Sequence, residues 1–106
     1  LFRAGETTTA TRVGELDFSA LPSPLLTGAS AHPCAPRVLV RTYAGLYLLT
    51  APAGSPFESV FAAPLVRVPS QSEPQGESVA WTVDGRSYRT LSEGRAQSMY
   101  EARCRE

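Results

Sequence analysis

The chain has 106 residues, a formal net charge of zero and 42% hydrophobic residues. This length allows one domain with one modest core, and the apolar content excludes a disordered protein. The zero net charge gives no indication of a nucleic acid or an anionic membrane as partner, and no apolar run is long enough for a membrane span. Lys, Asn and Ile are absent. This absence indicates a GC-rich genome, as in a GC-rich bacterium.

The first third of the chain predicts only weak strands, over residues 11–17 and 24–30. The sequence begins with Leu1 rather than Met and continues into a Thr-rich stretch. We expect such a start inside a longer protein or at a mature end after cleavage. A stronger pattern covers 37–50, which is apolar at both odd and even positions. It predicts a hairpin whose strands are packed between two layers.

One short helix is expected near 56–62. Ser55-Pro56-Phe57-Glu58 matches a capping box with Pro at the first helical position, and Pro64 limits its length. The prolines between Pro22 and Pro74 exclude any long helix.

The clearest strand signal is the alternation from Ser78 to Val83, followed by Asp84-Gly85. This pair favours a type I′ hairpin, which places Trp81 opposite Tyr88 on the buried face. Further strands are expected over 65–68 and 97–103.

Together these elements predict an all-β fold of two antiparallel four-stranded meanders. The limits are about 11–50 for the first blade, 51–64 for an insert and 65–104 for the second blade, within one β-sheet unit over 1–106. Two successive meanders are typical of two blades of a β-propeller.

The sequence from Gly76 to Arg86, closed by Ser92-Glu93-Gly94, resembles the blade motif of bacterial secreted β-propellers. The nearest groups are the WD40-like or TolB-like repeats and the phytase-like esterase propellers. The stretch 28–49 is similar to the same repeat. The resemblance implies an extracellular or periplasmic location and a chain that is part of a larger propeller. Its partners would be other blades, or copies of itself joined through exposed sheet edges.

An exported chain with two cysteines favours a disulfide between Cys34 and Cys104. In the propeller interpretation both lie on the same side of the sheets, Cys34 in a turn between strands and Cys104 at the end of a last strand. The alternative is two unlinked cysteines. Two cysteines and His32 supply too few ligands for a metal site, and His32 is interpreted as a surface loop residue.

Glu77 and Glu93 form the one candidate site. The Asp84-Gly85 hairpin pairs residue 77 with 92 and 76 with 93, which brings the two carboxylates together at its open end. Paired carboxylates can bind Ca²⁺, and the phytase-like resemblance would place them at a metal-lined channel. The alternative is a solvated strand end, or a Glu paired with Arg67, Arg86 or Arg95.

The first functional hypothesis is a non-catalytic binding or scaffold segment of an exported β-propeller that meets a protein partner. It requires no catalytic residue and no cofactor. The alternative is a fragment of a Ca²⁺-dependent, phytase-like or esterase-like hydrolase propeller. A third possibility is a complete small β-sandwich or barrel.

Overall fold

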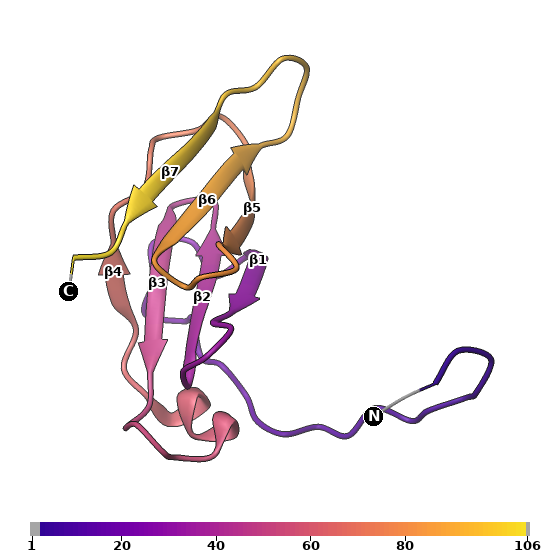
Figure 1. Cartoon of the computed structure of the whole chain (residues 1–106). Coiled ribbons are helices and arrows are strands. Elements are labelled where there is room, and N and C mark those ends of the chain that lie inside the picture. The colour runs from indigo at the N-terminus through magenta and orange to yellow at the C-terminus, as the bar shows by residue number, and fades with distance from the viewer. Residues whose placement is uncertain (1–2, 106) are drawn as a thin grey trace.

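The computed structural model describes residues 3–105 as two antiparallel sheets and one short 3-10 helix (Figure 1). The first sheet runs in sequence order through β1 (Leu26–Ala31), β2 (Arg37–Thr42), β3 (Gly45–Thr50) and β4 (Val66–Val68). The second runs through β5 (Gly76–Trp81), β6 (Ser87–Ser92) and β7 (Met99–Arg103). The helix η1 (Phe57–Ala62) lies between β3 and β4. The all-β prediction is confirmed, and neither sheet closes into a barrel.

The strands are divided between the sheets differently from the prediction. Residues 11–17 form no strand, and Val13 in that segment is 56% exposed. As a strand, this segment would have at most one apolar side chain on each face. The burial of so few apolar groups does not offset the conformational entropy that the segment would lose on joining a sheet. The short strand β4 pairs with β3, with Val68 opposite Leu46, so it belongs to the first sheet. The sheets therefore span 26–68 and 76–103 rather than 11–50 and 65–104, and the second has three strands.

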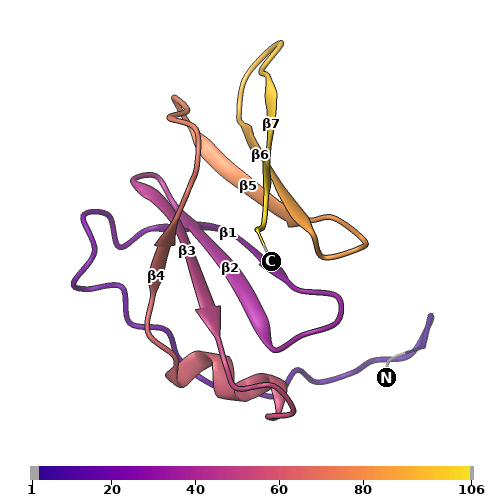
Figure 2. The same cartoon turned by 60° about the vertical axis from the view of Figure 1, so that its left-hand side comes forward.

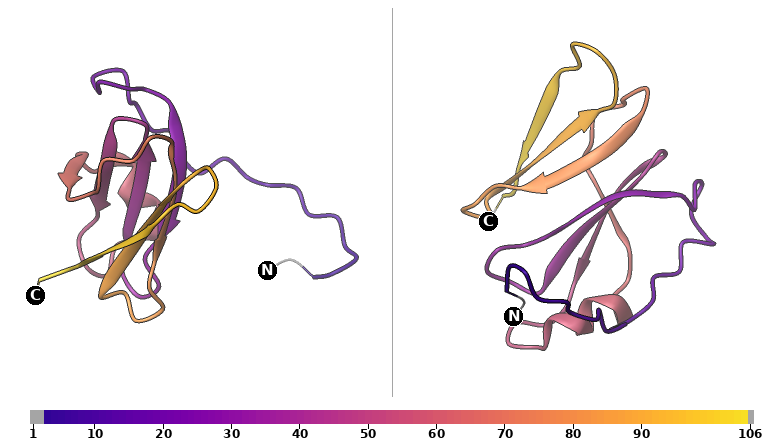
Figure 3. Two further views of the ribbon diagram at one scale, coloured as in Figure 1. Left: turned by 90° about the horizontal axis from the view of Figure 1, so that it is seen from above. Right: turned by 90° about the vertical axis from the view of Figure 1, so that its right-hand side faces the viewer.

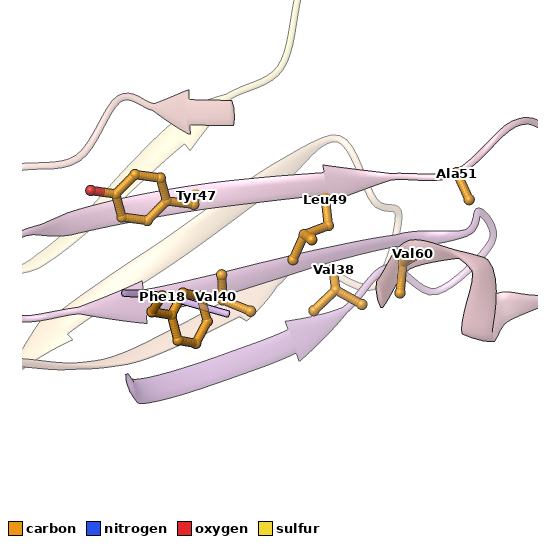
Figure 4. Packing of buried hydrophobic residues seen from close by; sticks show 7 residues of the cluster. All are labelled: Phe18, Val38, Val40, Tyr47, Leu49, Ala51 and Val60. Carbon is orange, nitrogen blue, oxygen red and sulfur yellow. The ribbon is translucent and has the colours of Figure 1, made fainter. Parts of the chain in front are cut away.

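Strand β2 is buried on both faces, as its sequence predicts. Val38 and Val40 point to one side, into a core with Tyr47 and Leu49 of β3 and with Val60 of η1 (Figure 4). Phe18 and Ala51 complete this core. The N-terminal segment and η1 therefore cover the face of the first sheet that lies away from the second sheet.

The predicted helix forms, but as a 3-10 helix over Phe57–Ala62. Pro56 occupies the N-cap position and no side chain caps the helix, so the Ser55–Glu58 capping box is not used. Six helical residues between Pro56 and Pro64 leave little room for α-helical hydrogen bonds, and 3-10 geometry is common in such short pieces.

The other face of β2 packs against the second sheet. Leu39 of β2 and its neighbour on the same face, Leu46 of β3, are fully buried against Val79 and Tyr88. Each fully buried Leu contributes about 1.5–3 kcal/mol relative to an exposed one. Figure 3 shows the two sheets as separate layers that splay apart on one side.

The two sheets come closest at their first strands, β1 and β5 (Figure 2). The Thr27 hydroxyl donates to the carbonyl of Gly76 at 2.8 Å, and the Trp81 amide donates to the Ser30 hydroxyl at 3.0 Å. Glycine at position 28 permits this approach, since an added Cβ would lie 2.6 Å from the carbonyl oxygen of Glu77. The close approach of the β1 and β5 backbones therefore sets the position of one sheet relative to the other.

The β5–β6 hairpin has the predicted pairing of Trp81 with Tyr88, but its turn differs. Gly85 has a positive φ of 67° and Asp84 does not, which excludes type I′. Instead, the Gly85 amide donates to the carbonyl of Thr82 at 2.9 Å. The Asp84 carboxylate accepts from the Thr82 hydroxyl at 2.6 Å and from the Arg86 amide at 3.0 Å.

Candidate functional site

Glu77 and Glu93 lie at the same end of the second sheet, but with a different pairing from the predicted one. Gly76 pairs with Ser92, and the extra residue, Glu77, forms a bulge before Ser78 pairs with Leu91. Past the bulge the Glu93 amide donates to the carbonyl of Gln75 at 2.8 Å. A bulge re-aims the side chain of its extra residue. Glu77 therefore points toward the first sheet.

Tyr43, in the β2–β3 turn, is the group that Glu77 contacts. Its hydroxyl donates to Oε1 of Glu77 at 2.7 Å. This hydrogen bond raises the pKa of Tyr43, with the negative charges of Glu77 and Glu93 adding to the effect. Both carboxylates therefore lie within electrostatic reach of one phenol, which the sequence alone did not indicate.

These groups alone make a sparse calcium site. Calcium takes six to eight oxygen ligands, and the residues 3–105 contain no cluster of three or more His, Cys, Asp and Glu side chains that could hold a metal ion. The Tyr43 hydroxyl already occupies one oxygen of Glu77. Calcium binding by Glu77 and Glu93 stays a prediction.

The two cysteines are free thiols, and both are exposed. The expected Cys34–Cys104 disulfide is thus not formed, although both residues lie beside the β5–β6 turn. The Cys104 amide donates to the carbonyl of Arg86 at 2.9 Å, while the Cys34 amide donates to Nδ1 of His32 at 3.0 Å.

His32 is half-buried at the contact between the sheets, rather than a free surface residue. Because Nδ1 accepts from the Cys34 amide, Nε2 carries the proton and donates to the carbonyl of Gly85 at 3.1 Å. The ring also meets the indole of Trp81 edge-on, with centroids 4.8 Å apart. Both ring nitrogens therefore form hydrogen bonds, and His32 connects the β1–β2 turn to the β5–β6 turn.

An ion pair between the sheets was not predicted. Arg41 and Glu73 have side chains 5% and 3% exposed, with Nη2 of Arg41 3.4 Å from Oε1 of Glu73. The Thr90 hydroxyl donates to the same oxygen at 2.7 Å, and Nη1 of Arg41 donates to the carbonyl of Ser78 at 2.9 Å. Oε2 of Glu73 is buried and has no hydrogen-bond partner among the described residues. The one signal in the sequence is that Arg41 directly follows the apolar run Val38-Leu39-Val40 in a strand predicted to be buried on both faces.

An open groove of about 1380 Å³ lies at the opposite end from Glu77 and Glu93, around the β5–β6 turn. Two carboxylates and five arginines line it: Asp84, Glu101, Arg37, Arg86, Arg89, Arg103 and Arg105. The groove therefore contains five of the ten positively charged residues of the chain but only two of its ten negatively charged residues. Scattered along the sequence, these arginines gave no sign of a cluster.

Glu101 is the one carboxylate in the groove that is paired with arginine. Nε of Arg89 donates to Oε2 of Glu101 at 2.9 Å, which holds the pKa of Glu101 below its ordinary value, and Arg103 lies 3.8 Å from Oε1. Within residues 3–105, no carboxylate oxygen lies within 4.0 Å of the guanidinium of Arg37 or Arg86.

Comparison of the chain with protein-family models, with curated proteins and with solved structures finds no match. The resemblance to secreted β-propellers accordingly rests on the motif residues alone. Within residues 3–105, no helix is long and apolar enough to cross a membrane.

Proposed function

We propose that this chain is a non-catalytic binding or scaffold segment of an exported β-propeller protein, comprising two adjacent blades. The observation that carries the proposal is the order in which the chain forms the two sheets and the position of the second sheet against the first. The chain leaves the first sheet at its outer strand β4 and enters the second at β5, which lies against β1. In a propeller, each blade is a four-stranded meander, and blades are arranged radially around a central channel.

The two sheets offer different faces to further blades. The far face of the first sheet is covered by η1 and by the segment around Phe18. The far face of the second sheet carries Ala80, Leu91 and Met99, none of which is buried, beside the Arg89–Glu101 ion pair. A third blade, or a second copy of the chain, would therefore pack on this second face.

The size of the purified chain in solution tests the proposal. We expect the chain to self-associate through the far face of the second sheet or the open edge of β7. Light scattering after size-exclusion chromatography measures the mass directly. Leu91→Glu should lower the associated fraction, while Val13→Glu, an equal change on an exposed residue outside the sheets, should not. A compact monomer at all concentrations would contradict the two-blade proposal.

A second candidate is a segment of a Ca²⁺-dependent, phytase-like or esterase-like hydrolase propeller. It is favoured by the placement of Glu77 and Glu93 around the Tyr43 phenol. Calcium should then raise the unfolding temperature of the chain, and Glu77→Gln with Glu93→Gln should remove this rise. Unfolding temperatures that do not respond to calcium in the unmutated chain would leave the hydrolase proposal without a site.

A further inference from the structure

The groove around the β5–β6 turn contains more arginines than its one ion-paired carboxylate, Glu101, can neutralise. Arg37, Arg86 and Arg105 are exposed, and none of them pairs with a carboxylate among residues 3–105, so their guanidinium groups remain available to a ligand. We propose that this groove binds an acidic peptide segment of a protein partner, with carboxylates of the peptide pairing with these arginines. This inference rests on the proposed function as a binding segment, and it names the class of ligand that the segment would bind.

Charge is the first argument. The chain as a whole is neutral, yet the groove holds five arginines against two carboxylates. One of these carboxylates, Glu101, forms ion pairs with Arg89 and Arg103. The other, Asp84, accepts hydrogen bonds from groups of its own turn. The groove therefore carries excess positive charge that an anionic ligand neutralises, and a guanidinium pairs with carboxylate in a bidentate geometry.

The backbone of the turn argues against a site for a single phosphate group. Such sites use several free amide N–H groups that converge on one point. Here the Gly85 amide donates to the carbonyl of Thr82, and the Arg86 amide donates to Asp84. The Ser87 amide donates to the Thr82 hydroxyl at 3.1 Å. Because these backbone amides already have acceptors within the turn, the donors left for a ligand are the guanidinium groups of the arginines. These groups are spread along the groove, so they suit an extended ligand with several carboxylates.

The aromatic residues argue against single-stranded nucleic acid. Proteins that bind single strands stack bases on exposed aromatic rings. The groove is lined by one aromatic residue, Trp81. Its indole already makes edge-on contacts with His32 and with Tyr88, at centroid distances of 4.8 and 5.7 Å. An acidic peptide needs no stacking surface, so it fits this lining better.

The test is the binding of a fluorescein-labelled peptide of alternating Asp and Glu, about ten residues long, to the full chain at low ionic strength. Fluorescence anisotropy gives the dissociation constant, and a Gln peptide of equal length is the neutral comparison. We expect saturable binding of the acidic peptide and none of the Gln peptide. Added salt should weaken the binding because exposed charges are screened.

Arg37→Gln with Arg86→Gln should weaken binding about two- to thirtyfold, as expected for the loss of two exposed ion pairs. The matched control is Arg12→Gln with Arg95→Gln, which makes the same charge change outside the groove and should alter binding less than about twofold. Circular dichroism and urea unfolding of each variant verify that it is folded.

Several outcomes would overturn the proposal. These are the absence of saturable binding, equal weakening by the groove variant and the control, and tighter binding of tripolyphosphate or of a thymidine oligonucleotide than of the peptide. The assay uses the single chain and no assembled ring. A monomeric chain that binds the peptide would therefore refute the two-blade proposal alone, and an associating chain that ignores the peptide would refute this inference alone.

Discussion

Replacing Arg41 with Met tests whether the ion pair between the sheets is as buried as its geometry indicates. Met keeps most of the side-chain length and removes the charge. Glu73, whose side chain is 3% exposed, would then be left with the Thr90 hydroxyl as its remaining hydrogen-bond donor. Removing one partner of a buried pair costs about 3–5 kcal/mol, because the other charge stays buried without compensation. We expect Arg41→Met to lower the free energy of unfolding by this amount.

Urea unfolding followed by Trp81 fluorescence and by circular dichroism measures the effect. With a slope of about 1–1.5 kcal/mol per molar urea, the midpoint should fall by about 2–5 M. Arg41→Met combined with Glu73→Leu should recover much of the loss, since apolar residues often replace a buried pair without cost. The control, Arg12→Met, breaks a pair with Glu15 whose side chains are 72% and 76% exposed, and should cost less than about 1 kcal/mol. Arg41→Met within 1 kcal/mol of the unmutated chain would refute the reasoning.

Two further predictions concern the turn between β5 and β6 and the thiols beside it. The Thr82 hydroxyl lowers the pKa of Asp84 below its ordinary value of 3.8, so the stabilisation from Asp84 is present above that pH and is lost as the pH falls through the folded-state pKa. Asp84→Asn should therefore flatten the loss of stability on acidification, measured as unfolding temperature between pH 6 and pH 2; an unchanged profile would contradict this. Cys34 and Cys104 should both react with a thiol reagent in the folded chain, since both are exposed. A non-reduced mass two hydrogens lighter would instead show a disulfide.

The fold class could be predicted from local sequence patterns. The β2–β3 hairpin follows from apolar residues on both faces of 37–50, and the Trp81–Tyr88 pair follows from alternation around Asp84-Gly85. These are short-range signals, and both strand pairings are confirmed, whereas the type I′ turn predicted at Asp84-Gly85 does not form. The sheet to which 66–68 belongs depends on contacts with β3, which is 20 residues away, and no local pattern encodes it.

The candidate site was harder to predict for the same reason. One bulge at Glu77 changes the pairing of everything beyond it, so the predicted pairing of 77 with 92 is off by one residue. Arg41 of β2 meets Glu73 of the β4–β5 connection. The arginines of the groove come from β2, β6, β7, the β5–β6 turn and the residues after β7. Such sets depend on how the sheets dock, which the residue types alone do not specify.

The contacts that join the sheets have a consequence for the order of folding. The hydrogen bonds from Thr27 to Gly76, from Trp81 to Ser30 and from His32 to Gly85 connect residues 49, 51 and 53 positions apart. Closing loops of this length costs chain entropy before any contact forms, whereas each meander grows from neighbouring strands. We expect the two meanders to form early and their docking to limit the rate. If Ser30→Ala lowered stability without slowing refolding, the docking contact would form after the rate-limiting step, and this order would be contradicted.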